Sequence, residues 1–192
     1  MGIDFGLKTF LTLSDATQIK APRYYLAYLK RLKKLQRSLS KKQKGSNNYK
    51  RAKRALAKLH IKIANTRRDY FHKLANQIAK SYEFVVIEDL NIKAMQRLWG
   101  KKISDYAFSG FVNILEYKTN LIKIDRYYPS SKTCSKCGYV LDKLDLKTRK
   151  WRCPKCDTLH DRDVNAAINI CRVGASTLGI GEVRPAIIGI PA

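Results

Sequence analysis

Two Cys-x-x-Cys pairs near the C-terminal end constrain this chain more than any other feature. Cys134 and Cys137 form the first pair, Cys153 and Cys156 form the second, and fifteen residues separate the pairs. At this spacing two tight turns bring four thiolates around one tetrahedral ion. A reduced redox pair or unconnected thiols would be the alternative. Because four thiolates leave no coordination position open, the pattern predicts one structural Zn²⁺ without a catalytic role.

The chain is strongly basic. Its 192 residues include 39 Lys and Arg but only 15 Asp and Glu, which gives a net charge of +24. Nucleic acid is the expected polyanion, because each neutralised phosphate releases counterions. This charge argues against a zinc-ribbon protein that mainly contacts other proteins. No run approaches the ~18 apolar residues of a membrane span, and the sequence opens without a signal peptide, so we expect a cytoplasmic protein without membrane contact.

The pattern of apolar residues predicts an α/β protein. Apolar residues alternate in the first fifteen positions, as in two strands joined by a turn, and a continuous β-branched run follows much later at 84–87. Such a run is typical of a strand buried on both faces in the middle of a sheet. The expected elements are strands within 1–15 and at 17–20, 84–87 and 121–125, and helices at 105–118 and 163–172.

A basic helical hairpin is expected within residues 22–80. Leucines recur there at spacings of three and four, and residues 44–48 interrupt the pattern. Between residues 20 and 80 the chain has 20 Lys or Arg and one acidic residue, Asp69. A solvated helix face would normally carry acidic partners as well, so their near absence favours contact with phosphates. The candidate contact residues are Lys30, Lys33, Lys34, Arg37, Lys41, Lys42, Arg51, Lys53 and Arg54.

Three carboxylates occupy positions where a charge needs a partner. Asp4 lies in the first strand, Glu88 ends the apolar run at 84–87, and Asp163 begins the last helix. An unpaired buried charge costs several kcal/mol, whereas two divalent ions ~3.5–4 Å apart take oxygen ligands and assist phosphodiester cleavage. An ion pair, a strand-end surface group and a helix cap would explain the same residues without a metal. The residue pattern alone leaves both interpretations open.

Four short motifs resemble those of the TnpB (OrfB) family of transposon-encoded proteins, which are similar to the type V CRISPR effector nucleases. The resemblance extends from Met1 to about Arg172, and the motifs occur in the order of the family around the cysteine pairs. They are Gly2-Ile3-Asp4-Phe5-Gly6, Ile87-Glu88-Asp89-Leu90-Asn91, Ser130-Ser131-Lys132-Thr133-Cys134 and Asp161-Arg162-Asp163-Val164-Asn165-Ala166-Ala167.

This resemblance implies an RNase H-like, RuvC-type mixed sheet with a zinc ribbon inserted before the last helix. The three motif carboxylates, which bind magnesium for DNA cleavage in the family, map onto Asp4, Glu88 and Asp163, and two Mg²⁺ ions are expected. DNA and a guide RNA are the implied partners. The implied divisions are a nuclease core at 1–128 that includes the hairpin at 22–80, a zinc ribbon at 129–160, a final helix at 161–173 and a flexible tail at 174–192.

Two departures from the family affect the functional expectation. The sequence begins at the first nuclease strand, without the N-terminal region that contacts guide RNA in full-length relatives, and the connection from 116–118 to 121–125 is shorter than usual. The resemblance therefore implies an N-terminally truncated member. A magnesium-dependent DNA endonuclease is the leading hypothesis. The alternative is a nucleic-acid-binding relic or regulator without useful cleavage, and the sequence makes no prediction of oligomeric state.

Overall fold

A five-stranded mixed sheet forms the centre of the protein. The computed structural model describes residues 1–6, 8–20, 23–92, 94, 95, 97, 100 and 106–179. The strands lie in the order β3-β2-β1-β4-β5; the β1–β2 and β2–β3 pairs are antiparallel, and the β1–β4 and β4–β5 pairs are parallel. The predicted mixed α/β architecture is therefore confirmed. The strands are β1 (Gly2–Phe5), β2 (Leu11–Leu13), β3 (Gln18–Ile19), β4 (Phe84–Glu88) and β5 (Asn120–Ile124).

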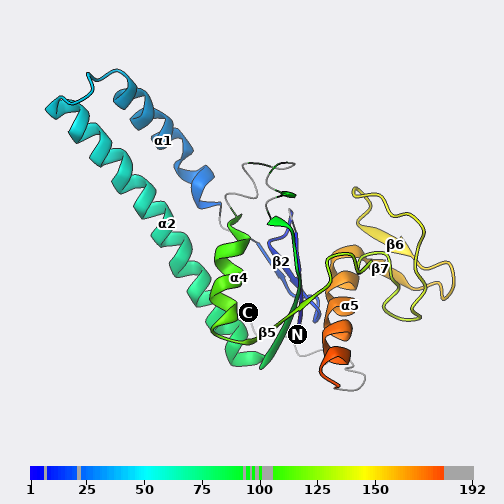
Figure 1. The fold of residues 1–192 in the computed structure, drawn as a ribbon. Coiled ribbons are helices and arrows are strands. Elements are labelled where there is room, and N and C mark those ends of the chain that lie inside the picture. The colour runs from blue at the N-terminus through cyan, green and yellow to red at the C-terminus, as the bar shows by residue number, and fades with distance from the viewer. Residues whose placement is uncertain are drawn as a thin grey trace.

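The basic segment forms the predicted helical hairpin. Helix α1 spans Tyr24–Ser40 and α2 spans Asn47–Ser81. The side chain of Ser46 begins α2 by accepting a hydrogen bond from the backbone of Tyr49 at 3.1 Å. The outer part of the hairpin is held by a small apolar cluster, centred on Leu32, Leu59 and Ile63, between its own two helices. Figure 1 shows this part as an arm that extends away from the sheet.

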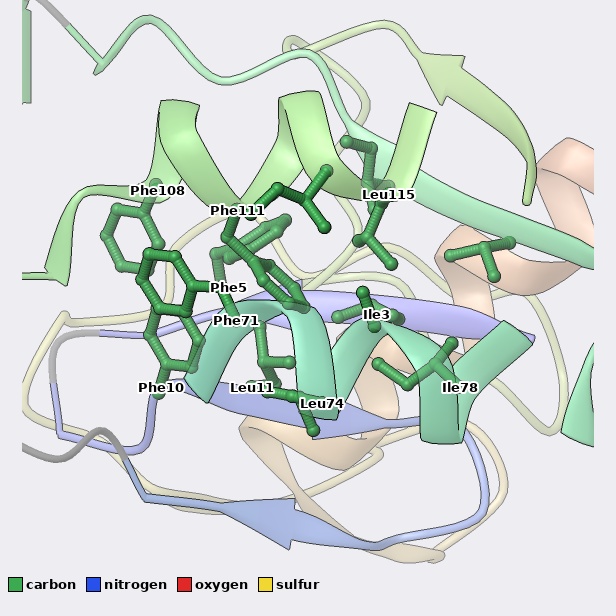
Figure 2. Close-up of a cluster of buried hydrophobic side chains, with 14 of the residues drawn as sticks. Ile3, Phe5, Phe10, Leu11, Phe71, Leu74, Ile78, Phe108, Phe111 and Leu115 are labelled. Atoms are coloured by element: carbon green, nitrogen blue, oxygen red, sulfur yellow. The ribbon is translucent and has the colours of Figure 1, made fainter. Parts of the chain in front are cut away.

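One face of the sheet carries the main hydrophobic core. The C-terminal half of α2 and helix α4 (Phe108–Glu116) cover this face, and Figure 2 shows the aromatic side chains that fill it. Phe10 stacks on Phe71 and Phe108 with ring centroids 5.7 and 5.4 Å apart. Helix α4 is shorter than the predicted helix at 105–118: it ends at Glu116, and it begins at Phe108, after Ala107 in the left-handed conformation. Residue 105 lies outside the described residues.

Helix α5 (Arg162–Thr177) covers the opposite face. Because side chains alternate along a strand, the residues between the core positions Ile3 and Phe5 on β1, and between Val85 and Ile87 on β4, point toward α5. Val86 confirms this, since it packs with Ile170 of α5. A short antiparallel pair, β6 (Lys150–Arg152) and β7 (Leu159–Asp161), precedes α5. Apart from Asp161, it belongs to the segment at 129–160 that contains the four cysteines, which we call the cysteine module.

The prediction of a flexible tail from residue 174 is wrong for residues 174–177, which belong to α5. The reason is packing against the sheet. A Cβ built on Gly174 would lie 2.4 Å from the side chain of Val86, and the adjacent Ala175 is buried. The remainder of the predicted tail beyond residue 179 lies outside the described residues. Among the helices described, none is long and apolar enough to cross a membrane.

The contact between α5 and β1 predicts a strict requirement for glycine at position 2. A Cβ on Gly2 would lie 2.1 Å from the carbonyl oxygen of Ala167 and 2.6 Å from the backbone nitrogen of Cys171, so Gly2→Ala should lower the free energy of unfolding by about 3 kcal/mol. Gly110→Ala is the matched control. It lies in α4 with nothing within 4 Å of its added Cβ, and should stabilise by up to about 1 kcal/mol. Urea unfolding measures both; equal effects would contradict the close packing.

Candidate carboxylate and cysteine sites

Two of the three predicted carboxylates come from neighbouring parallel strands. The register of β1 and β4 pairs Ile3 with Ile87, so Asp4 and Glu88 are the next residue on each strand. Neighbouring strands are roughly 5 Å apart, and both residues alternate with core positions. Both side chains are half-buried. Asp4 and Glu88 therefore lie together on the face of the sheet that α5 covers.

The third carboxylate is brought in by the first turn of α5. Asp161 is the N-cap of this helix, because its side chain accepts hydrogen bonds from the backbone of Asp163 and Val164 at 3.1 and 3.2 Å. Asp161 is thus occupied as a cap, whereas the side chain of Asp163 pairs with Arg149 instead. Asp89, the acidic neighbour of Glu88, forms an exposed ion pair with Arg126.

The charges of the three carboxylates affect one another. Burial, followed by the charges of Glu88 and Asp163, raises the pKa of Asp4 from 3.8 to about 8, although Arg162 and Arg149 oppose the change. Burial also raises the pKa of Glu88, against a lowering effect of the hydrogen bond from Ser130. The site therefore holds a proton at neutral pH unless a cation compensates its charge.

Arg149 is a site residue that the sequence did not reveal. Its guanidinium lies 3.3 and 3.4 Å from the two carboxylate oxygens of Asp163, and the side chain of Asp163 is only 19% exposed. Arg149 precedes β6, so the cysteine module delivers this charge to the carboxylates. It is one of 39 Lys and Arg in the chain, and no spacing or pattern distinguished it.

A buried network fixes Glu88 relative to α5. The hydroxyl of Ser130 donates to Glu88 at 2.5 Å. The side-chain amide of Asn169 donates to the carbonyl oxygens of Ser130 and Thr133, at 2.8 and 2.6 Å, and that of Asn165 to Thr133 at 2.7 Å. Both asparagines are almost fully buried. Ser130 and Asn165 belong to the motifs that carried the family resemblance, so the signal was present, but their contacts required the tertiary structure.

The carboxylates form an open site. Among the described residues, the four cysteines alone form a group of three or more His, Cys, Asp or Glu whose ligand atoms all lie within 4.8 Å of one another. Asp4, Glu88 and Asp163 are thus too far apart to surround one ion as they stand. Two ions ~3.5–4 Å apart, each with ligands at ~2.1 Å, would accept oxygens up to about 8 Å apart. The spacing of the carboxylates therefore does not match a site for a single ion.

The four predicted cysteines do come together. The sulfur atoms of Cys134 and Cys156, and those of Cys137 and Cys153, are 3.6 Å apart. Tetrahedral Zn–S bonds of ≈ 2.3 Å would place the sulfurs about 3.8 Å apart, so the cluster fits such an ion. The fifth cysteine, Cys171, lies apart from this group on α5.

Two polar side chains contact the sulfurs. The ring nitrogen Nε2 of His160 lies 3.1 Å from the sulfur of Cys134, and burial lowers the pKa of His160 and keeps the ring neutral. Hydrogen bonds from the side chain and backbone of Thr158 lower the pKa of Cys156 to about 6. The hydrogen bonds from Thr158 favour the thiolate form of Cys156, which is the form that binds metal.

The predicted nucleic-acid contacts lie on the hairpin and are all exposed. Ion pairs do little to neutralise them, since Asp69, the acidic residue of this segment, pairs with Lys73 at 2.8 Å. The exposed residues are Lys30, Lys33, Lys34, Arg37, Lys41, Lys42, Arg51, Lys53 and Arg54.

Comparison with known proteins agrees with this geometry. A family profile described as "Probable transposase", OrfB_IS605, matches residues 1–98, and the profile "Cas12f1-like, TNB domain" matches residues 108–170. The chain is similar to a "Putative RNA-guided DNA endonuclease" of Streptomyces pristinaespiralis, with 40% identity over 96% of this chain and 48% of the relative. It is also similar to the "Putative RNA-guided DNA endonuclease InsQ" of Escherichia coli K12, with 32% identity over 95% of this chain and 51% of the relative. The chain spans about half the length of these curated relatives.

The structure resembles the Cas12f1 chain of a Cas12f1–sgRNA–target DNA complex, with a TM-score of 0.58, 22% identity and coverage of 88% of this chain and 37% of that one. The chain thus has a mixed α/β fold that resembles part of Cas12f1. It belongs to the OrfB_IS605 family of transposon-encoded proteins, and the predicted resemblance to TnpB is confirmed.

The raised pKa of Asp4 predicts an unusual dependence of stability on pH. The unfolded chain releases this proton near pH 3.8 but the folded chain holds it to about 8, so without added divalent ions the protein should lose stability as pH rises between these values. Asp4→Asn removes this loss. The variant should match the wild type near pH 4 and exceed it by at least about 2 kcal/mol at pH 8 in urea unfolding. Parallel pH curves would show that Asp4 ionises freely. Asp89→Asn, at an exposed ion pair, should change stability by less than about 1 kcal/mol throughout.

Proposed function

We propose that this chain is the nuclease part of a TnpB-like protein, with a RuvC-type, RNase H-like fold that cleaves DNA with divalent metal ions. The observation that carries the proposal is the convergence of Asp4, Glu88 and Asp163, from two parallel strands and a helix, on one face of the sheet. Folding raises the pKa of Asp4 to about 8, and a bound cation would remove that cost. Membership of a family whose relatives are named endonucleases supports the same function.

In this proposal Asp4, Glu88 and Asp163 would hold two Mg²⁺ ions, which would supply charge stabilisation for the attacking and leaving oxygens of a phosphodiester. The protein's own groups hold the ligands in place. Ser130 orients Glu88, and the cap at Asp161 fixes the turn that bears Asp163. Arg149 pairs with Asp163 in the metal-free site, and it would be available to a phosphate if a cation took its place at Asp163.

The hairpin is the proposed surface for the nucleic-acid backbone. Its exposed Lys and Arg gain affinity by counterion release and position a strand without reading its sequence. DNA is the proposed substrate. A guide RNA is the proposed partner, since relatives matched over most of this chain are named as RNA-guided.

The cysteine cluster is the proposed site of one structural Zn²⁺ in a ribbon between β5 and α5. Its sulfur spacing supports this ion, and four thiolates leave no place for substrate. Arg149 of the ribbon pairs with Asp163. Asn165 and Asn169 of α5 hold the carbonyl of Thr133, the residue just before Cys134. Zinc would therefore act on cleavage only by holding these residues.

A second candidate function is nucleic-acid binding without useful cleavage. The observation that favours it is the ion pair between Arg149 and Asp163, which occupies a carboxylate that the metal would need. If this pair persists when magnesium is added, the site cannot take up its second ion. The basic hairpin would still bind.

The nuclease proposal predicts cleavage of single-stranded DNA in magnesium or manganese. Asp4→Ala, Glu88→Gln and Asp163→Asn should each lower the rate by more than about a hundredfold, because each removes a metal ligand. Gel analysis of a labelled strand measures the rates. Asp89→Asn is the matched control and should cleave like the wild type, because Asp89 is held by Arg126. Equal activity of Asp4→Ala and wild type would reject the metal assignment, and binding without cleavage at any metal concentration would favour the second candidate.

The zinc proposal predicts about one zinc ion per chain in the purified protein. Chelation, or Cys137→Ser, should remove the ion and expose Trp151, which is buried against the cysteines. Elemental analysis and a red shift of tryptophan fluorescence measure the two effects. Cys171→Ser is the control and should retain its zinc. A chain that folds normally with Trp151 buried and no metal present would refute the assignment.

A further inference from the structure

Both ends of the loop that follows β5 lie beside Glu88. Ile124, the last residue of β5, is paired with Glu88 in the sheet register, and Ser130 donates its hydroxyl hydrogen bond to the same carboxylate. Tyr127 lies midway, three residues from each end. An extended chain spans at most ~3.6 Å per residue, so the Cα of Tyr127 lies within about 11 Å of those of Ile124 and Ser130. Tyr127 is therefore close to the carboxylate site.

Hydrogen bonds and packing fix this loop. The backbone N–H of Tyr127 donates to the side chain of Asp125 at 2.9 Å, and the backbone of Tyr128 donates to the carbonyl of Asp125 at 3.2 Å. Tyr128 packs into the apolar cluster beneath α5. The carbonyl of Tyr128 then accepts from the backbone of Ser130 at 2.8 Å. The loop is thus anchored on both sides of Tyr127.

The side chain of Tyr127 points away from this anchor into solvent. It is 85% exposed, more than any other large hydrophobic side chain in the described part of the chain. A single exposed aromatic residue is common on protein surfaces and needs no explanation alone. Here the ring projects from an anchored loop that contacts one of the three carboxylates, Glu88, through Ser130, which is a suitable position for a substrate contact.

The electrostatics of this region favour a neutral contact. The three carboxylates offer no positive charge to a phosphate, and the adjacent Arg126 is engaged by Asp89. An aromatic face adds affinity without charge, because any base can stack on it. Stacking would therefore hold a strand beside Glu88 without a further phosphate contact.

We propose that Tyr127 is a stacking platform for an unpaired base of the DNA strand that reaches the carboxylates. The inference rests on the proposed nuclease function and adds the substrate contact beside its site. It assigns single-stranded DNA, with an accessible base, as the form of substrate held there.

The test is binding of a fluorescent single-stranded oligonucleotide to the full chain without added magnesium, measured by anisotropy. Tyr127→Ala should bind on the order of tenfold more weakly, and Tyr127→Phe should bind like the wild type because it keeps the ring. Tyr117→Ala is the matched control. Tyr117 is also exposed, at 63%, but precedes β5 at the opposite end of that strand. Its loss should leave affinity unchanged.

Two further readouts separate stacking from a merely structural role. The salt dependence of binding should be the same for Tyr127→Ala and wild type, since no phosphate contact is lost. With an oligomer of abasic deoxyribose phosphates, the two proteins should bind equally. The inference is overturned if Tyr127→Ala loses as much affinity for the abasic strand as for the normal strand, or loses none for the normal strand. It is also overturned if the wild type does not bind, or if the variant affects binding of RNA but not of DNA. If stacking is observed but the wild type does not cleave in magnesium, the nuclease proposal fails and the stacking contact stands.

Discussion

The close contact between α5 and the sheet is the constraint on which the candidate site depends. Gly2 and Gly174 allow backbone and side chain to approach where a Cβ would collide, at 2.1 and 2.4 Å respectively. This approach brings the first turn of α5, with Asp163, to the face on which Asp4 and Glu88 already lie. If α5 lay farther from the sheet, Asp163 would not lie near Asp4 and Glu88, and the three acidic residues would not form a site. The packing therefore creates the site.

That packing brings together carboxylates whose burial and mutual repulsion are unfavourable. Burial and mutual repulsion raise the pKa of Asp4 to about 8, so the three carboxylates are not all charged together at neutral pH without a compensating cation. The protein holds them there by other interactions, chiefly the buried amides of Asn165 and Asn169 on the segment that contains Ser130. The same segment leads into the first cysteine, so the cysteine module and the carboxylates share one support.

Much of the fold could be predicted from local pattern. The apolar run at 84–87 forms an interior strand of the sheet, β4, the segment with the leucine spacing forms the hairpin, and the four cysteines form one cluster. The end of α5 was predicted too early, because Gly174 and Ala175 read as loop residues and are helical only through their contact with the sheet. Arg149 was not predicted, since a single arginine among many acquires its role from the neighbour that folding supplies.

By itself the sequence determined the types of element and indicated the four clustered cysteines and the three candidate carboxylates, because these depend on patterns between residues close together in the chain. It also determined the family, through motifs that keep their order along the chain. Only the tertiary structure decided that Asp4 and Glu88 share a face, that Asp161 and Asp89 have other partners, and that Ser130 holds Glu88. These contacts are between residues far apart in the chain. Strand register and helix packing determine them, and a local sequence pattern carries no information about either.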